Sequence, residues 1–426
     1  MRVLLIGNGG REHAMANKIS SSALCEQLYT APGNPGTALC GTNVSLDVTQ
    51  AFQIGSFIEQ NKIGLVVVGP EQPLVDGLYD QLLQGGYLQN CRFFGPGANG
   101  ARLEGSKSFA KAFMLKHQIP TAAYKAFHAN QAQEAIAYLD ELDPPFVLKA
   151  DGLAAGKGVL ICSTKKEAQD ELMELFGGKF GHASDNVVIE AFLEGIEMSV
   201  FALVKDNRYV LLPEAKDYKR IGEEDTGLNT GGMGSVSPLP FYTPALARFV
   251  EERIVQPTIT GLQNEGIQYT GFVFFGLMVK DEKAQVIEYN VRMGDPETQS
   301  VLMRLDGDLL EILLALTDNK PLPPYNFSSQ TVVNVVLASQ GYPNHYEKGK
   351  LIETWENIEN AMVFQAGTIK NEKGELLTAG GRVMSACGIG PDLKSALEVA
   401  YQQVNKIQYE GKYCRQDIGL DVISKA

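Results

Sequence analysis

Apolar runs alternate with glycine-rich turns in the first hundred residues and predict an open, doubly wound α/β sheet. Residues 2–6 form an apolar run that leads into Gly7–Gly10 and then a helical pattern through about Ile19. Three more units of a strand followed by a loop are found at residues 27–36, 65–71 and 92–97. Ligands bind beyond the carboxyl ends of the strands in such sheets, so we expect these loops to form a binding site in a domain of residues 1–102.

The pattern changes twice along the rest of the chain. We predict one helical segment at about 104–117, followed by strands and glycine-rich turns from about 120 to 300. Pro321–Pro324 indicates a linker. Beyond it we predict a strand at 331–338 and a helix at 393–407 whose apolar residues recur on one face. The last part of the chain is therefore expected to form a third domain of about 100 residues.

Composition and charge narrow the class of protein. The 426 residues are 44% hydrophobic and 20% charged, which is ordinary for a globular protein of two to four domains. The formal net charge of −13 argues against a nucleic-acid or acidic membrane partner. No apolar run approaches the ~20 residues that span a bilayer, and the first one is too short for a signal-peptide core. The six cysteines and five histidines show no metal-ligand spacing. We expect a cytoplasmic protein with small-molecule ligands.

Two glycine-rich motifs are candidates for phosphate binding. The first, Gly7 to Glu12, begins like a dinucleotide fingerprint, but Glu12 stands where the third glycine would be. It could place a phosphate at a helix N-terminus or form a tight turn. The second, Lys149 to Gly158, lacks the glycine spacing and the Ser/Thr of a Walker A loop. A flap over a triphosphate and a solvated surface loop both fit it.

A polar stripe is predicted on the strand that begins at about Val286. Residues two apart share one face of a strand, so Glu288, Asn290 and Arg292 should line up. Glutamate and asparagine supply hard oxygen donors that suit Mg²⁺. Arg292 could meet a phosphate or carboxylate with two parallel hydrogen bonds. Polar stripes on solvent faces of strands are also common, so the spacing alone leaves both interpretations open.

Taken together, the motifs resemble those of the phosphoribosylamine–glycine ligases, an ATP-grasp family, over nearly the whole chain. The matching segments are GNGGREH, APGNPGT, VVGPE, PLVDG, LEGSK, LKADGLAAGKGV, NTGGMG, IEYN, GDPETQ and AGGRV. Leu228 stands where the family's loop usually has proline, and Met293 where phenylalanine is common. Neither position requires a polar group for the chemistry.

The resemblance implies an α/β and α+β multidomain fold. It places the doubly wound N-terminal domain at 1–102 and a central ATP-grasp region at 103–326, with a lid inserted at about 121–190. A small α+β C-terminal domain would occupy 327–426. The implied activity is ligation of glycine to 5-phosphoribosylamine through a glycyl phosphate, in purine biosynthesis, by a monomer that uses ATP and Mg²⁺ (or Mn²⁺).

The resemblance also implies a role for individual residues. Those implied to bind ATP are Lys107, Lys149, Gly156, Gly158, Glu190, Ala191, Phe192, Leu193 and Glu197. Those implied to hold the metal ion are Glu288 and Asn290. Those implied to bind the amine substrates are Gly9, Gly10, Arg11, Asn34, Glu71 and Asp217. Those implied to act in catalysis are Arg292 and Asp295.

Three other functions compete with this interpretation. An ATP-grasp purine enzyme that uses a different carboxylate would share the catalytic core but not the NTGGMG and GDPETQ segments. A NAD-dependent oxidoreductase would need an acidic residue about 20 residues after the first glycine loop, and Tyr29–Gly33 offers none. A nucleotide-binding regulator without catalysis would not need the full set of lysines, metal donors and arginine.

Overall fold

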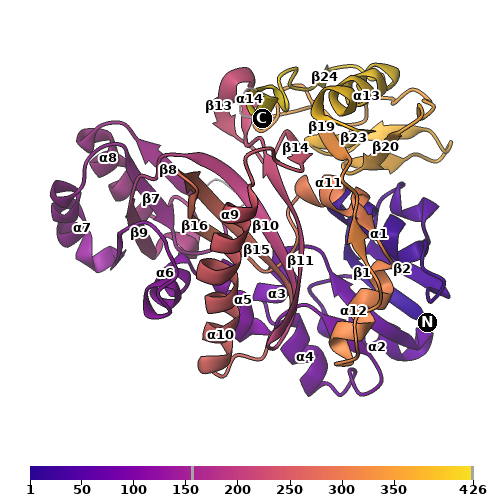
Figure 1. Cartoon of the computed structure of the whole chain (residues 1–426), viewed down its shortest axis with the longest axis horizontal. Helices are drawn as coiled ribbons and strands as arrows, with labels where there is room; N and C mark the ends of the chain where they lie inside the picture. The colour runs from indigo at the N-terminus through magenta and orange to yellow at the C-terminus, as the bar shows by residue number, and fades with distance from the viewer. Residues whose placement is uncertain (155–157, 424–426) are drawn as a thin grey trace.

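The N-terminal region is a parallel sheet flanked by helices, drawn in indigo and violet in Figure 1. In this computed structural model, which describes residues 1–154 and 158–423, its strand order is β3-β2-β1-β4-β5. The strands are β1 (Arg2–Gly7), β2 (Gln27–Pro32), β3 (Thr42–Asn43), β4 (Ile63–Val68) and β5 (Arg92–Phe94). The helices are α1 (Gly10–Ser20), η1 (Thr37–Leu39), α2 (Ala51–Asn61), α3 (Glu71–Val75), α4 (Leu78–Gln84) and α5 (Ala98–Gly105).

The strand order of this sheet explains why β1 is buried and where its loops lie. Val3 to Ile6 of β1 are fully buried, as expected for a central parallel strand covered on both faces. The order reverses between β1 and β4, because β2 and β3 lie on one side of β1 while β4 and β5 lie on the other. The loops after β1 and β4 therefore flank the position where open α/β sheets bind ligands. The predicted doubly wound fold is confirmed.

The helix predicted at about 104–117 is confirmed over residues 107–116, but its predicted start is wrong. Two helices, α5 and α6 (Lys107–Lys116), meet at Ser106, whose backbone is extended at φ −141° and ψ 112°. The Ser106 hydroxyl accepts a hydrogen bond from the Phe109 N–H at 3.2 Å and so caps the start of α6. Residues 104–108 carry no apolar side chain, and Ser106 in the middle of them is the helix boundary.

A four-stranded sheet with helices on its outer side projects from the rest of the molecule, on the left in Figure 1. Its strands, in the order β6-β9-β7-β8, are β6 (Tyr124–His128), β7 (Phe146–Ala150), β8 (Val159–Cys162) and β9 (Asn186–Ala191). Its helices are η2 (Ala129–Gln131), α7 (Ala132–Tyr138), η3 (Leu139–Glu141), α8 (Lys165–Phe176) and η4 (Gly181–Ser184). It has a separate small core that includes Leu148, Leu172 and Ile189. We call it the small sheet.

A nine-stranded sheet joins the central and C-terminal regions. Eight strands follow the order β16-β15-β10-β11-β14-β19-β23-β20, and β24 also pairs with β19. The strands are β10 (Ile196–Lys205), β11 (Arg208–Asp217), β14 (Gly234–Ser237), β15 (Thr270–Lys280), β16 (Lys283–Asn290), β19 (Thr331–Ser339), β20 (Ala361–Gln365), β23 (Arg382–Gly390) and β24 (Lys412–Tyr413). Because β14 pairs with β19, the two regions share backbone hydrogen bonds.

The helices around this sheet complete the core. They are α9 (Pro244–Val250), the π-helix η6 (Glu251–Val255), α10 (Gln256–Asn264), α11 (Glu297–Met303), α12 (Leu309–Thr317), α13 (Leu393–Lys406), α14 (Leu420–Ile423) and the short η5 (Glu223–Asp225). Three two-stranded sheets pair β12 (Arg220–Gly222) with β13 (Thr226–Asn229), β17 (Leu305–Asp306) with β18 (Asn326–Phe327), and β21 (Thr368–Lys370) with β22 (Leu376–Thr378).

The remaining predictions about elements divide into correct and incomplete ones. The strand predicted at 331–338 and the helix predicted at 393–407 each match within one residue as β19 and α13. The prediction of strands and turns from 120 to 300 missed helices α7 to α10.

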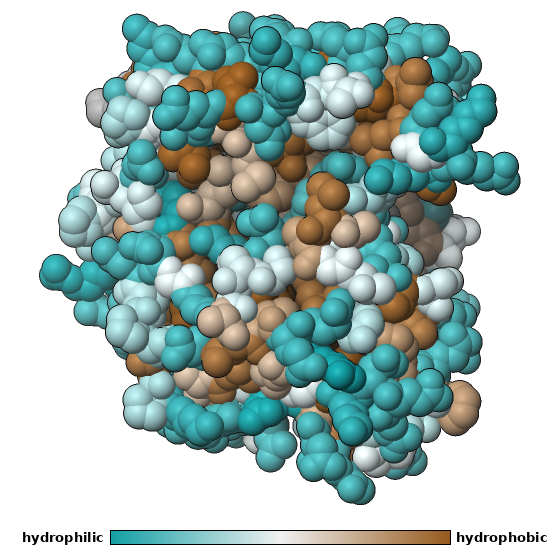
Figure 2. Space-filling model, turned by 90° about the vertical axis from the view of Figure 1, so that its right-hand side faces the viewer, coloured by the Kyte–Doolittle hydropathy of each residue, from teal (hydrophilic) through white to brown (hydrophobic). Residues whose placement is uncertain are grey.

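Polar residues cover most of the side of the molecule seen in Figure 2, with apolar residues in separate patches between them. Among the described residues, no helix is long and apolar enough to cross a membrane.

Candidate active site

Two buried lysines meet one glutamate between the small sheet and the rest of the protein. Lys149 on β7 and Lys111 on α6 each place Nζ 3.0 Å from Oε2 of Glu190 on β9. Lys149 also donates to the Ile287 carbonyl of β16 at 3.1 Å and so links the two sheets. Glu190 Oε1 is buried and has no hydrogen-bond partner within the described residues. Sequence reasoning found Lys149 and Glu190 but missed Lys111.

The position of Lys111 carried a weak signal. It follows Lys107 by four residues on α6, and such residues lie close together on one side of a helix. Its side chain is 2% exposed, and burial lowers the pKa of Lys111 to about 8, although Glu190 partly offsets this effect. A buried lysine beside a glutamate is not evident from spacing alone, because burial depends on how α6 packs against β9.

The predicted phosphate-binding lysine Lys107 is the first residue of α6 and contacts the glycine-rich segment that begins at Lys149. Its Nζ donates to the Gly152 carbonyl at 3.1 Å. Asp151 braces the same turn by accepting a hydrogen bond from the Ser108 N–H at 2.6 Å. Gly158 accepts from the Ala150 N–H at 2.8 Å. The predicted ATP contact Gly156 lies outside the described residues.

Burial also lowers the pKa of Lys107, although Glu288 opposes the shift and Lys149 adds to it. The pKa of Lys107 therefore depends on the charges of both Glu288 and Lys149. The pKa of Glu288 is below its ordinary value: burial raises it, but the combined charges of Lys219, Lys149 and Lys107 outweigh burial. This arrangement supplies positive charge on one side of an ionised carboxylate.

Glu288 and Asn290 fit the predicted role of metal ligands. They alternate on β16, and neither side chain makes a hydrogen bond or ion pair within the described residues. Their oxygens are the hard donors that Mg²⁺ prefers. A β-bulge separates the pair Gly276–Glu288 from the pair Leu277–Val286, so Ile287 has no partner in β15. The carbonyl of this unpaired residue accepts the hydrogen bond from Lys149 Nζ at 3.1 Å.

The prediction that Arg292 continues this strand stripe is wrong. The strand ends at Asn290, and Arg292 lies beyond it, where its guanidinium contacts two carboxylates. Nε is 3.2 Å from Glu71 Oε2, and Nη2 is 2.9 Å from Glu104 Oε1. Burial lowers the pKa of Arg292, but Glu104 and Glu71 more than compensate, so the pKa stays above its ordinary value. Arg292 thus joins the segment after β16 to the start of α3 and to α5.

Glu104 is a partner of Arg292 that sequence reasoning missed. It is 7% exposed, and its Oε2 accepts the Val291 N–H at 2.8 Å. Burial raises the pKa of Glu104 to about 7, even though Arg292 works in the opposite direction. The signal that could have identified it is the LEGSK segment, in which only the lysine was interpreted.

A second charged group lies at the end of β11. Lys219 Nζ is 2.9 Å from Oε2 of Glu197, the residue predicted to bind ribose. Burial raises the pKa of the predicted substrate contact Asp217, whereas Lys219 lowers it. Glu297 was not predicted; burial and Asp217 together raise its pKa to about 7, and it accepts a hydrogen bond from Ser199 Oγ at 3.1 Å. These carboxylates offer acceptors for an amine.

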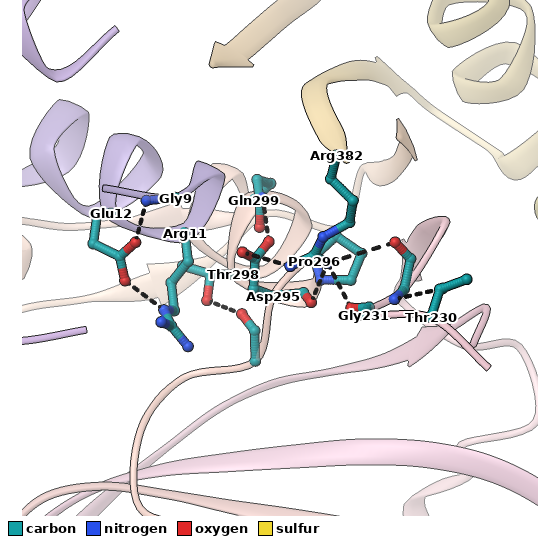
Figure 3. Close-up of polar contacts among 12 residues, drawn as sticks. Gly9, Arg11, Glu12, Thr230, Gly231, Asp295, Pro296, Thr298, Gln299 and Arg382 are labelled. Carbon is teal, nitrogen blue, oxygen red and sulfur yellow. Dashed lines mark hydrogen bonds and ion pairs between the residues drawn. The ribbon is translucent and has the colours of Figure 1, made fainter. Parts of the chain in front are cut away.

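The N-terminal glycine loop is closed by the residue that replaces the third glycine (Figure 3). Glu12 accepts the Gly9 N–H at 2.6 Å through one oxygen and Arg11 Nε at 2.6 Å through the other. Arg11 Nη1 also donates to the Met293 carbonyl at 3.1 Å. A Cβ on Gly10 would lie 2.5 Å from Gln299 Nε2, so a larger residue there would require the Gln299 side chain to move. The Gly9 N–H is therefore already satisfied by the protein.

Asn34 braces the loop after β2. Its Nδ2 donates to the Asn8 carbonyl at 2.8 Å and to the Gln365 carbonyl at 3.0 Å, and its Oδ1 accepts the Gly36 N–H at 2.7 Å. The side chain is buried and its hydrogen-bonding groups are used within the protein. This geometry makes Asn34 a support for the loop after β1.

Asp295, predicted to be catalytic, lies where the N-terminal loop, the central region and the C-terminal region meet (Figure 3). Its Oδ1 accepts Gln299 Nε2 at 3.0 Å, and its Oδ2 is 3.0 Å from Nη2 of Arg382. The AGGRV segment is part of the family resemblance, but sequence reasoning assigned no role to its arginine, Arg382. Its contact with Asp295 crosses 87 residues of sequence and depends on the pairing of the C-terminal strands.

The chain matches, in succession, all three parts of one known family. Residues 1–104 match the N domain of phosphoribosylglycinamide synthetase, residues 105–298 its ATP-grasp (A) domain, and residues 332–421 its C domain. The chain belongs to the phosphoribosylamine–glycine ligase family. The ligase of Chlorobaculum tepidum is 45% identical over 99% of this chain and 100% of its own length. That of Pasteurella multocida is 42% identical over 100% of this chain and 99% of its own length.

Solved structures agree with this family assignment. The crystal structure of phosphoribosylamine–glycine ligase from Thermotoga maritima is 34% identical and superposes with a TM-score of 0.84 over 98% of this chain and 100% of that one. Biotin carboxylase from Campylobacter jejuni has a TM-score of 0.74 at 13% identity, over 100% of this chain and 96% of that one, which shows a shared fold alone. The chain is an ATP-dependent ligase of the ATP-grasp type in this family.

Proposed function

We propose that this chain joins glycine to 5-phosphoribosylamine using ATP and Mg²⁺, and releases glycinamide ribonucleotide, ADP and phosphate. A carboxylate is a poor electrophile, so the first step transfers the γ-phosphoryl group of ATP to a carboxyl oxygen of glycine. A new P–O bond forms as the bond to ADP breaks. The amine of phosphoribosylamine then attacks the acyl carbon, a C–N bond forms, and phosphate leaves with that carboxyl oxygen while the amine loses a proton.

The nucleotide would lie between the small sheet and β16. Lys149 supports this placement because its Nζ reaches across from β7 to the Ile287 carbonyl of β16. Lys107 and Lys149 would hold the phosphates, the segment from Glu190 to Leu193 at the end of β9 would face adenine, and Glu197 would bind the ribose hydroxyls. The buried Oε1 of Glu190, which lacks a donor within the described residues, suits the exocyclic amine of adenine.

Glu288 and Asn290 would hold the metal ion beside the phosphates. Within the described ranges, no group of three His, Cys, Asp or Glu residues is arranged to hold a metal ion by itself. Two protein oxygens plus substrate phosphates are the usual way that proteins bind Mg²⁺. When bound, the ion neutralises charge on the β- and γ-phosphates. Arg292 would contact the transferring phosphoryl group or the oxyanion that forms during amine attack.

The amine substrates would occupy the space beside the reversal of strand order in the N-terminal sheet. Gly9, Gly10 and Arg11 follow β1, and Glu71 follows β4. Asp217 and Asp295 would orient the amines of the two substrates, since carboxyl oxygens accept hydrogen bonds from N–H groups. Asn34 would act through the loop that it braces.

One observation carries this proposal: Lys149 reaches from the small sheet to Ile287 of β16, next to Glu288 and Asn290, and the charges of Lys219, Lys149 and Lys107 hold the pKa of Glu288 below its ordinary value. Cations and oxygen donors in one place suit a metal–triphosphate complex. The test is ADP release by the purified enzyme with each substrate omitted in turn. We expect release that requires both glycine and phosphoribosylamine. Equal release when formate or bicarbonate replaces glycine would refute the choice of glycine.

A further inference from the structure

Arg382 reaches from the C-terminal region into the proposed active site (Figure 3). It is the first residue of β23, and its guanidinium makes contacts with two separate segments of the central region. Nη2 is 3.0 Å from Asp295 Oδ2, and Nη1 donates to the Asp295 backbone carbonyl at 2.6 Å. Nη1 also donates to the Gly231 carbonyl in the NTGGMG segment. One planar group thus fixes both the side chain and the backbone of Asp295.

Two of the three glycines of the NTGGMG segment, Gly231 and Gly232, lie against these contacts. A Cβ on Gly231 would lie 3.0 Å from Arg382 Cζ, and a Cβ on Gly232 would lie 2.3 Å from Pro296 Cδ. Gly232 also has a φ of +109°, which side chains disfavour. A second residue of the C-terminal region, Tyr342, accepts the Gly231 N–H on its hydroxyl at 2.9 Å. A side chain at Gly232 would clash with Pro296, and one at Gly231 would press on the Arg382 guanidinium.

Asp295 is enclosed by charged and polar groups from every segment packed against it. Arg382 approaches from β23, Arg11 from α1, Arg292 from the segment after β16, and Gln299 from α11. Burial alone would raise the pKa of Asp295. The three arginines and the Gln299 hydrogen bond have a larger, opposite effect, so the pKa lies below its ordinary value. Asp295 is therefore an ionised acceptor held in one orientation.

We propose that Arg382 is a positioning residue for the ligation: it fixes Asp295 and the backbone of residues 231–232 so that the carboxylate can orient an amine substrate. This role rests on the proposed function, in which Asp295 accepts a hydrogen bond from a substrate amine. Arg382 acts through Asp295 and contacts no reacting atom itself. A planar guanidinium can make the side-chain and backbone contacts together, whereas the single ammonium of lysine cannot. The C-terminal region thereby completes the active site.

The test compares Arg382→Lys and Arg382→Gln with the wild type. We expect both variants to lose about tenfold to hundredfold in kcat/KM for glycine or phosphoribosylamine, since a misplacement of about 1 Å can cost 10²-fold. The KM for ATP should stay unchanged, because the proposed nucleotide contacts lie at Lys107 and Lys149. A rise in ATP KM alone would overturn the proposal.

The pH profile separates positioning from a general structural effect. Asp295 must be ionised to accept the hydrogen bond, so activity should fall as pH drops through its pKa. Arg382→Gln removes a neighbouring positive charge, which raises the pKa of Asp295 and should move the acid limb of kcat/KM upward by about one pH unit or more. Arg382→Lys retains the charge and should leave the limb in place while kcat still falls.

Arg415 provides a matched control. It is also an arginine of the C-terminal region that reaches the central region, through Asp225 at 2.8 Å and the Arg220 carbonyl at 3.1 Å. It has no contact with Asp295 among the described residues. We expect Arg415→Lys to lower the melting temperature without moving the acid limb. If Arg415→Lys lost as much kcat/KM and shifted the acid limb as much, the effect of Arg382 would be that of any contact between the two regions, and the positioning role would be refuted.

A double-mutant cycle with Asp295→Asn tests whether Arg382 acts through Asp295. We expect Arg382→Lys to cost little in the Asp295→Asn background, since the carboxylate that it positions is gone. A loss as large as in the wild-type background would overturn the proposal. No ADP release from wild-type enzyme with glycine and phosphoribosylamine would refute the proposed function itself. Normal wild-type turnover together with unchanged Arg382 variants would refute only the role of Arg382.

Discussion

Replacing Arg292 by alanine removes the cation at the end of β16, two residues beyond Asn290. If its guanidinium meets the transferring phosphoryl group or the oxyanion, the interaction exists only in the transition state. We therefore expect Arg292→Ala to lower kcat by about 10²–10³, as for loss of one preorganised oxyanion donor, with little change in the KM for ATP. Arg292→Lys should restore only part of the activity, because a point charge cannot replace a planar fork.

The ion pairs of Arg292 set the structural cost of this substitution. Glu104 is 7% exposed, and breaking a buried pair costs about 3–5 kcal/mol. The side chain of Glu71 is 33% exposed, so its pair adds at most about 1 kcal/mol. Because the pKa of Glu104 is already about 7, it can bind a proton at neutral pH when its cation is lost. We expect a destabilisation at the low end of the range, about 3 kcal/mol.

Steady-state kinetics with glycine and phosphoribosylamine saturating, together with urea unfolding of each variant, measure these two effects separately. Glu104→Gln is the control, because it breaks the same buried pair and leaves Arg292 in place. It should lower stability but retain kcat within about tenfold of the wild type. The catalytic role of Arg292 is refuted if Arg292→Ala keeps a near-normal kcat and only raises the KM for ATP. It is also refuted if Glu104→Gln loses as much kcat as Arg292→Ala.

Three further predictions concern the metal, the nucleotide and pH. The double variant Glu288→Ala, Asn290→Ala should lose Mg²⁺-dependent turnover in a metal titration, and full metal-dependent activity would contradict the ligand assignment. Lys149→Met should raise the KM for ATP at least tenfold, because a phosphate contact and the link to β16 are lost together; an unchanged KM would exclude that role. Burial lowers the pKa of His13 to about 4, so unfolded chains bind more protons than folded ones between pH 6.5 and 4. Stability should fall by about 3 kcal/mol as pH drops through that window, and His13→Gln should remove this slope in urea unfolding.

The parts of the site that could be predicted from sequence are those set by local geometry. Strand alternation placed Glu288 and Asn290 together correctly, because β16 extends through both residues. The same rule failed for Arg292, since nothing in the sequence indicated that the strand ends at Asn290. The helix boundary at Ser106 was also missed, because the extended backbone of Ser106 and its capping bond from the Phe109 N–H are evident only in the structure.

The residues that sequence reasoning missed act across long separations. Glu104 contacts Arg292 from 188 residues away, and Arg382 contacts Asp295 across 87 residues. Such contacts depend on how α5 and β23 pack against the central region, which periodicity does not determine. Lys111 was missed because its burial against Glu190 follows from the tertiary packing of α6. Local patterns identified the segments that form the site, and packing decided which of their side chains meet.

The most direct test of the account follows oxygen from glycine to phosphate. If ATP activates glycine as an acyl phosphate at Glu288, Asn290 and Arg292, the phosphate that leaves carries one oxygen from the glycine carboxyl group. Glycine labelled with ¹⁸O in both carboxyl oxygens should therefore yield inorganic phosphate with one ¹⁸O atom per turnover, measured by mass spectrometry or by the ³¹P chemical shift. Product formation with no ¹⁸O in the phosphate would contradict a glycyl phosphate intermediate and the mechanism built on this site.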